Sequence, residues 1–284
     1  MSMRKLDFKN FPLLLKEIPD PPKHLYMEGK LPSDDNKFLA VVGARKYSEY
    51  GKEATEMLIS GLRGFSIVIV SGLALGIDAI AHRAALGAGI KTIAIPGSGL
   101  SRKVLYPSVH HSLAENILAS GGTLLSEFEP EFRATPWSFP QRNRIMAGLA
   151  HAVLVIEAEQ KSGTLITSRL ATEYNRDVFT VPGSIFSKNS EGPHMLLRLG
   201  ATPVTNPKEL LQAIGFKQDD VPAVVDFANC SPEEIKVLEL IETPLAREDL
   251  VRALHISTSE ANALLSIMEI KGLIRESMGE IHRA

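Results

Sequence analysis

Apolar and polar positions alternate in blocks from about residue 38 to residue 215. The apolar blocks are short, rich in β-branched residues and almost unbroken by polar side chains, as in strands buried on both faces of a parallel sheet. They are Phe38–Gly43, Ser66–Gly72, Lys91–Gly97, Leu124–Phe128, His151–Ala158 and Asp177–Gly183. The stretches between them have helical spacing, for example Gly51–Leu62, Ile77–Leu86, Leu165–Tyr174 and Pro207–Ile214. This alternation predicts an α/β fold with a doubly wound, mostly parallel sheet.

The remaining segments have different patterns. Residues 1–37 contain five prolines, which disfavour helix, and we expect a Pro-rich N-terminal arm lying in extended form on the 38–215 domain. Residues 216–230 have no clear period and are predicted to form a linker. Residues 231–284 begin with a helix-capping Ser231 before Pro232, followed by two more helical stretches and an apolar hairpin. Three helices with a hairpin predict a small winged helix-turn-helix domain.

Composition narrows the class of protein. Of 284 residues, 44% are hydrophobic and 23% are charged, which is ordinary for a folded globular protein. The lone cysteine, Cys230, excludes an intrachain disulfide and a thiolate metal cluster. The longest apolar stretch falls far short of the ~20 residues of a membrane-spanning helix, and the N-terminus does not match a signal peptide. We therefore expect a cytoplasmic protein without a membrane partner.

The charge is unevenly distributed along the chain. The net charge is −2, but residues 231–284 hold six Lys or Arg against ten Asp or Glu, a net charge of −4. Residues 1–230 therefore carry a net charge of +2. Because an average hides this distribution, the overall charge does not exclude a nucleic-acid partner for the larger part of the chain.

Small and cationic residues follow the predicted strands, at the edge where ligands bind to open parallel sheets. Glycine lets backbone amides approach an anion, and a helix N-terminus adds partial positive charge. The residues concerned are Gly43, Ala44 and Arg45 after the first strand, Ser71 and Gly72 after the second, Gly97 after the third, and Lys161, Ser162, Gly163 and Thr164 after the fifth. Any one glycine could serve only a tight turn, but together these residues predict an anion-binding site.

The sequence also limits which anion fits this edge. The P-loop motif and the Gly-x-Gly-x-x-Gly dinucleotide fingerprint are both missing. A series of phosphate-sized sites suits a polyanion at least as well as a single nucleotide. The segment 136–149 adds Arg142, Asn143 and Arg144 close to Trp137 and Phe139. These residues suit phosphates and unpaired bases; the alternative is that the aromatic residues are core and the arginines are solvated.

No catalytic or metal-binding constellation is evident in the sequence. Ser162 and Thr164 have no His–Asp partner at a convincing position, and the histidines do not have metal-ligand spacing with carboxylates. Glu127 and Glu157 end predicted strands and suit either acid–base or orienting roles. We therefore expect no enzymatic activity, no metal and no cofactor.

A set of short motifs occurs in one order between about residues 18 and 281. The motifs are Gly43–Ala44–Arg45, Ser71–Gly72–Leu73–Ala74, Gly76–Ile77–Asp78, Tyr106–Pro107, Phe139–Pro140, Arg142–Asn143–Arg144–Ile145, Ser162–Gly163–Thr164–Leu165, Val181–Pro182–Gly183 and Leu199–Gly200–Ala201. In this order they resemble the DNA-processing protein A (DprA, or Smf) family. The resemblance implies a Rossmann-like domain that binds single-stranded DNA, protects incoming strands and loads the RecA recombinase in natural transformation, without enzymatic activity.

The resemblance also assigns residues. It places Arg45 in a basic DNA-contacting pocket and by similarity adds further contacts, namely Arg142, Asn143, Arg144 and Lys161, with amides of Gly43, Ser162 and Gly163. It implies a homodimer whose interface includes Met195, Leu196, Leu197 and Leu199, for which a plain helix core is the alternative. We expect weak or no duplex binding, because the net negative charge of the winged helix does not offset phosphate repulsion and suits a protein-contact or regulatory role.

Two other classes of function remain open. Phosphoribohydrolase-type Rossmann enzymes cleave nucleotides on a similar fold, but the stretch Pro96–Gly97–Ser98–Gly99–Leu100 lacks their Pro-Gly-Gly-x-Gly-Thr motif and its following Glu. In the remaining class the protein is mainly a scaffold and the winged helix carries the function.

Overall fold

The computed structural model describes residues 3–216, 230–241, 245–254, 256–271, 273–277 and 280–283. The chain divides into two compact units, residues 1–220 and 221–284. Most of the predicted linker, residues 217–229, lies outside the described residues. Within the described residues, no helix has both the length and the apolar character needed to cross a bilayer.

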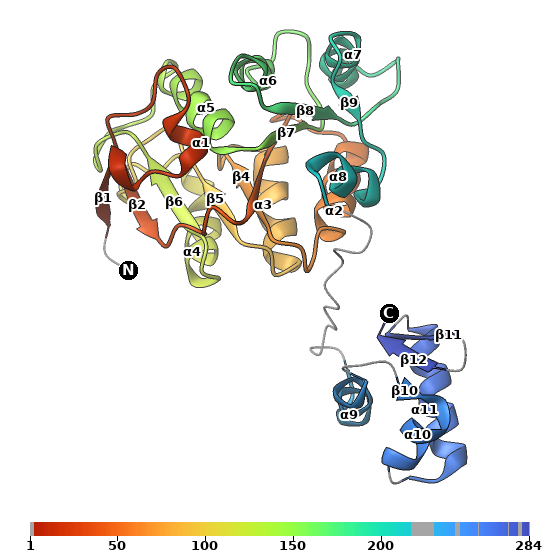
Figure 1. Ribbon diagram of the computed structural model, residues 1–284. Helices are drawn as coiled ribbons and strands as arrows, with labels where there is room; N and C mark the ends of the chain where they lie inside the picture. Colours follow the sequence, from red (N-terminus) through yellow and green to blue (C-terminus); the bar gives the residue numbers. More distant parts are fainter. Residues whose placement is uncertain are drawn as a thin grey trace. The chain divides into compact units, whose positions relative to one another are not determined.

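The larger unit is built on a nine-stranded sheet with helices on both faces (Figure 1). The strand order is β1-β2-β6-β5-β4-β3-β7-β8-β9, and every pair from β6 to β9 is parallel. The strands are β1 (Arg4–Asp7), β2 (His24–Gly29), β3 (Lys37–Val42), β4 (Ile67–Ser71), β5 (Thr92–Ala94), β6 (Thr123–Ser126), β7 (Ala152–Val155), β8 (Asp177–Thr180) and β9 (Thr202–Pro203). The doubly wound, mostly parallel sheet predicted from the apolar blocks is therefore confirmed.

The central strands are buried on both faces because helices cover each side of the sheet. Phe38, Ala40 and Val42 of β3 face one core, and Leu39 and Val41 face the other. Helices α1, α5, α6 and α7 pack on the first core, and α2, α3 and α8 pack on the second. The helices are α1 (Leu13–Lys16), α2 (Glu49–Ser60), α3 (Ile77–Gly87), α4 (His111–Ala119), α5 (Ser138–Leu149), α6 (Thr164–Glu173), α7 (Glu191–Arg198) and α8 (Pro207–Ile214), with short 3₁₀ turns η1 (Phe8–Asn10), η2 (Ser108–His110) and η3 (Lys188–Ser190).

The N-terminal segment differs from the expected extended arm. Strands β1 and β2 extend the sheet beyond β6 in antiparallel fashion, and Leu15 of α1 is fully buried in the main core. The prolines lie between these elements and not within them, at Pro12, Pro19, Pro21, Pro22 and Pro32. Proline lacks the N–H that a strand interior requires, but it does not prevent short strands and helices from forming between prolines. The segment from residue 3 to residue 37 therefore contributes to the sheet and its core.

The strand order reverses between β3 and β7. From β3 the chain builds β4 and β5 on one side, and β7 later pairs with the free side of β3 before β8 and β9 continue outward. At such a reversal the loops after the two strands leave toward opposite faces of the sheet and open a crevice, where ligands bind in open α/β folds. The crevice lies at the carboxyl ends of β3 and β7.

The smaller unit is a winged helix, as predicted. Its helices are α9 (Pro232–Leu240), α10 (Arg247–Ala253) and α11 (Thr258–Ile270), and its sheet has the order β10-β12-β11, with β10 (Leu245–Ala246), β11 (Ile274–Ser277) and β12 (Glu280–Arg283). Capping boxes begin two of the helices, with Ser231 and Glu234 at α9 and Ser257 and Glu260 at α11. Buried apolar residues of all three helices and two strands form one core.

A buried histidine makes the stability of the larger unit depend on pH. His82 of α3 is fully buried and its Nδ1 lies 2.7 Å from the Thr92 hydroxyl. Burial lowers the pKa of His82 from 6.5 to about 3. Between pH 3 and 6.5 the unfolded chain binds a proton on His82 that the folded chain excludes. The contribution of neutral His82 to the free energy of unfolding is therefore complete above pH 6.5 and is lost as the pH falls toward 3.

We expect the free energy of unfolding, measured in urea, to fall by about 2 kcal/mol between pH 7 and pH 5 because of His82 alone. The variant His82→Asn removes the titrating group and should show a correspondingly flatter pH dependence. An equal pH dependence in the variant and the parent protein would contradict this assignment.

Candidate nucleic-acid interface

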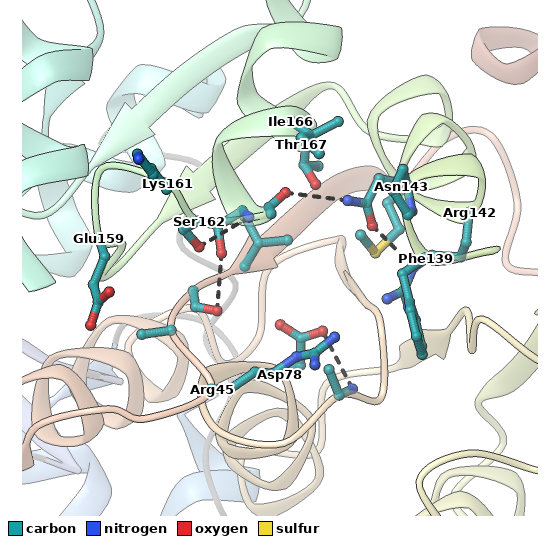
Figure 2. A pocket seen from close by; sticks show the side chains of 18 of the residues that line it. Arg45, Asp78, Phe139, Arg142, Asn143, Glu159, Lys161, Ser162, Ile166 and Thr167 are labelled. Atoms are coloured by element: carbon teal, nitrogen blue, oxygen red, sulfur yellow. Dashed lines mark hydrogen bonds between the residues drawn. The ribbon is translucent and has the colours of Figure 1, made fainter. Parts of the chain in front are cut away.

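A pocket of about 590 Å³ occupies the crevice at the carboxyl ends of β3 and β7. The β3–α2 loop contributes Arg45 and Lys46, the β7–α6 loop contributes Lys161 and Ser162, and α5 contributes Phe139. Figure 2 shows Lys161, Arg45 and Phe139 on different sides of the pocket, carried by elements far apart in the sequence. The pocket therefore joins cations and an aromatic face, and each comes from a different loop or helix.

The exposed cations of the pocket are available to a ligand. Arg45 is exposed, and its guanidinium carbon lies 5.3 Å from the centre of the Phe139 ring. This cation–π contact holds the side chain across the pocket without neutralising its charge. Lys161 is also exposed, and within the described residues neither Arg45 nor Lys161 takes part in an ion pair. Both positive charges can therefore bind an anionic ligand such as a phosphate.

Hydrogen bonds hold the N-terminus of α6 against the β3–α2 loop. The Thr164 hydroxyl donates to the Gly43 carbonyl at 3.1 Å, and the Asn143 side-chain amide donates to the Gly163 carbonyl at 3.4 Å. Gly163 is exposed, and a Cβ built there would meet nothing within 4 Å. An anion can therefore approach the positive end of the α6 dipole closely at this point. The amide of Ser162 is already bonded to the Glu159 carbonyl at 3.0 Å.

Arg142, which the resemblance implies as a DNA contact, is buried in the structure. It lines the pocket but is only 4% exposed, and its guanidinium donates to the carbonyls of Gly72, at 2.5 Å, and Ile95. Asp78, also buried, accepts hydrogen bonds from the amides of Gly72 and Ala74 at 3.1 and 3.4 Å. Arg142 therefore joins the ends of β4 and β5 and supplies the charge opposite Asp78.

Burial perturbs both members of this pair. It lowers the pKa of Arg142 to about 10, against the opposing effect of Asp78. It raises the pKa of Asp78, and the charge of Arg142, the two backbone amides and the charge of Arg45 oppose that rise. At neutral pH Arg142 remains protonated and balances the buried carboxyl group. Asp78 and Arg142 therefore form a buried charge pair in the wall of the pocket.

Two of the glycines predicted to face an anion make room for side chains of the protein itself. A Cβ on Gly72 would overlap the Arg142 guanidinium, and a Cβ on Gly97 would overlap the Phe139 ring. Neither residue lines the main pocket, although Gly72 borders a small adjoining cavity. Ser71 is fully buried and its hydroxyl donates to the Val41 carbonyl at 2.7 Å. These three residues support the pocket from behind.

Arg144 points away from the pocket. Its guanidinium pairs with Glu127, which Gln141 also contacts at 3.0 Å, and donates to the Asp20 carbonyl at 2.6 Å. On α5, two residues beyond Arg142, the helical turn of about 200° directs the side chain to the opposite side. Arg144 therefore fastens the N-terminal segment, and Glu127 has an orienting role.

The predicted dimer residues lie on and just after α7. Leu196 is buried in the core of the protomer, whereas Leu199 is 75% exposed. Met195, Leu196 and Leu199 border a groove of about 680 Å³ that runs between α6 and α7. Leu196 therefore has the helix-core role weighed as an alternative, and Leu199 offers a free apolar face.

Sequence reasoning missed Lys46 and Asn189. Asn189 follows β8 and donates to the Lys46 carbonyl at 3.0 Å and to Glu157 at 3.2 Å. Glu157 is buried and also accepts from the Ser48 amide at 2.9 Å and from the Ser48 hydroxyl. Lys46 could have been found as the neighbour of Arg45, but no local pattern marks Asn189. Glu157 has an orienting role, because it holds two pocket loops together.

Comparison with known proteins agrees with this architecture. The family model "DNA recombination-mediator protein A" matches residues 3–215, and the model "DprA winged helix domain" matches residues 226–280. The chain belongs to the DNA recombination-mediator protein A family. This DprA-family chain is 40% identical over 228 residues to Protein Smf of Escherichia coli, covering 80% of this chain and 60% of that protein. It is 44% identical over 208 residues to DNA processing protein DprA of Streptococcus pneumoniae, covering 72% of each.

Solved structures show the same fold. The X-ray structure of DprA from Streptococcus pneumoniae superposes with a TM-score of 0.71 at 41% identity and covers 76% of each chain. DNA processing protein A from Helicobacter pylori superposes with a TM-score of 0.68 at 33% identity, covering 75% of this chain and 96% of that one. The latter structure is described as giving insight into a single-stranded DNA binding mode.

Proposed function

We propose that this DprA-family protein binds single-stranded DNA by its backbone in the β3–β7 pocket. Arg45 and Lys161 contact phosphates, and the exposed end of α6 adds backbone dipoles. The supporting residues are Gly43, Ala44, Asn143, Ser162, Gly163 and Thr164, which line the same pocket. The observation that carries the proposal is the convergence of two exposed cations, Arg45 and Lys161, and a helix N-terminus at the reversal of strand order. The Helicobacter pylori relative, with its described single-stranded DNA binding mode, supports the choice of ligand.

Single strands fit this pocket better than duplex. The pocket is a recess lined by Phe139 and by cations on several sides, so one backbone can enter while its unstacked bases meet apolar surface. The winged-helix unit is acidic overall, since residues 231–284 carry a net charge of −4, and this charge opposes duplex binding. We assign that unit a protein-contact or regulatory role in place of duplex binding.

The bound strand is protected and passed to the RecA recombinase, and the protein acts as a cytoplasmic homodimer without chemistry on the DNA. Leu199 and the groove between α6 and α7 support the dimer, because an exposed apolar face of this kind suits a second copy. The orienting roles of Glu127 and Glu157 support a binding function over catalysis. In the described part of the chain, no three His, Cys, Asp or Glu side chains group in a way that could hold a metal.

A mobility-shift comparison tests the proposed function. We expect a 20-nucleotide single strand to bind at least ten-fold more tightly than the same sequence as duplex at equal salt. Deleting residues 221–284 should preserve that preference, because the pocket lies wholly in the larger unit. Equal affinity for both forms, or loss of single-strand binding in the truncated protein, would overturn the assignment to this pocket.

A further inference from the structure

Two loops next to the pocket carry apolar side chains that the protein leaves in solvent. Phe186 and Ile185, in the loop after β8, are 92% and 80% exposed. Tyr47 and Tyr50, on either side of the start of α2, are 44% and 51% exposed. We call these four residues the aromatic shelf. Phenylalanine and isoleucine are normally buried, so a cluster exposed to this degree marks a binding surface.

The two loops of the aromatic shelf form one continuous surface with the pocket. The Tyr50 hydroxyl donates to the Pro182 carbonyl at 2.6 Å, just before the Phe186 loop. At the other end of that loop, Asn189 donates to the Lys46 carbonyl at 3.0 Å. Asn189 and Lys46 themselves line the pocket. A strand that leaves the pocket past Lys46 therefore runs directly onto the aromatic shelf.

The Phe186 loop is ordered by its own hydrogen bonds. The amide of Phe186 donates to the Ser184 hydroxyl at 3.3 Å, and the amide of Ser187 donates to the Ser184 carbonyl at 3.0 Å. These bonds close a tight turn with Phe186 at its tip. A side chain held in this way loses less conformational entropy on binding than one on a loose loop.

The charges around the aromatic shelf favour a nucleic acid. Lys46 and Lys188 are both exposed, and neither takes part in an ion pair within the described residues. Glu49, the acid between the two tyrosines, is neutralised by Lys52 at 2.6 Å. Glu191 and Glu159 are exposed nearby and oppose the cations in part. Cations interleaved with aromatic faces are the surface that binds unpaired strands, since bases stack while phosphates pair with lysine.

We propose that the aromatic shelf is a nucleobase-stacking subsite for the nucleotides adjacent to those held in the pocket. Phe186 is its main stacking face, Tyr47 and Tyr50 extend it, and Lys46 and Lys188 pair with the intervening phosphates. The inference rests on the proposed function, because it concerns the same strand. It adds a second class of contact: the pocket binds the backbone, and the aromatic shelf binds the bases.

The test is the variant Phe186→Ala, measured by fluorescence anisotropy with a labelled 20-nucleotide thymidine strand. A lost base–aromatic stack is worth 1–3 kcal/mol, so we expect the affinity to fall by roughly 5- to 150-fold. Phe186→Leu should lose nearly as much, because it keeps the apolar character but not the ring, and Phe186→Trp should retain the affinity. Phe8→Ala is the matched control, since Phe8 is an exposed phenylalanine beside β1, at the opposite edge of the sheet.

A 20-nucleotide abasic strand separates stacking from backbone binding. It should bind the parent protein and Phe186→Ala equally, because it has no bases to stack. Two results would overturn the stacking subsite but leave the proposed pocket intact. In one, Phe186→Ala weakens binding of the abasic strand as much as binding of the thymidine strand. In the other, Phe186→Ala leaves binding of both strands unchanged while Arg45→Ala weakens both. If neither Phe186→Ala nor Arg45→Ala changes binding, the proposed function itself fails. Loss of a dimer in sedimentation of Phe186→Ala, with DNA affinity intact, would instead identify a protein-contact surface and overturn the inference.

Discussion

Arg45→Ala is expected to weaken binding of single-stranded DNA by about 10- to 100-fold, because a hydrogen bond to a charged group contributes about 1.5–3 kcal/mol. Arg45 is exposed at the pocket, is held over Phe139 and has no ion-pair partner among the described residues, so its guanidinium can bind a phosphate. Phosphates are the same in every sequence. The loss should therefore be nearly equal for thymidine, adenosine and mixed strands.

Salt titration gives this prediction a second measurement. Each phosphate contact on a single strand contributes about 0.7 to the slope of log affinity against log salt, so Arg45→Ala should lower the magnitude of the slope by about that amount. Arg83→Ala is the matched control, because Arg83 is exposed on α3 but does not line the pocket. An unchanged affinity and slope in Arg45→Ala would remove this residue from the interface.

Arg142→Ala is expected to act on the fold more than on the ligand, and to lower the free energy of unfolding by about 3–5 kcal/mol. The substitution leaves the buried Asp78 carboxyl without the stronger of the two positive charges that act on it and the carbonyls of Gly72 and Ile95 without the Arg142 donor. Urea unfolding followed by circular dichroism measures the loss. A normal stability combined with lost DNA binding would show instead that Arg142 contacts the strand directly.

A double variant distinguishes the buried charge from the lost packing. Asp78→Asn combined with Arg142→Met removes both charges and keeps most of the volume, so it should be more stable than Arg142→Met alone, which has the same volume but leaves Asp78 without Arg142. Asp78→Asn alone leaves Arg142 buried and uncompensated and should destabilise the larger unit. If the double variant is less stable than both Asp78→Asn and Arg142→Met, then the uncompensated buried charge is not the cause of the loss.

The elements that the sequence predicts are those whose burial imposes a regular pattern on neighbouring residues. The strands β3 to β8 and helices such as α2, α3 and α8 follow from periodicity, because burial on both faces imposes an uninterrupted apolar run and burial on one face imposes helical spacing. The winged helix is evident in the same way, from capping residues and one apolar face. The N-terminal strands were not predicted, because a two-stranded edge addition leaves only a weak local pattern among prolines.

The amino-acid order determined the architecture, the edge of the sheet that carries the pocket, and Arg45 and Lys161 as its exposed cations. The folded chain determined the use of the other candidates: Arg142 balances Asp78, Arg144 pairs with Glu127, and glycines such as Gly72 make room for neighbouring side chains. It also brought Asn189 and the aromatic shelf to the pocket from a segment that follows β8. The physical reason is range: periodicity and capping depend on residues a few positions apart, whereas burial and pairing of a side chain depend on contacts between segments far apart in the sequence.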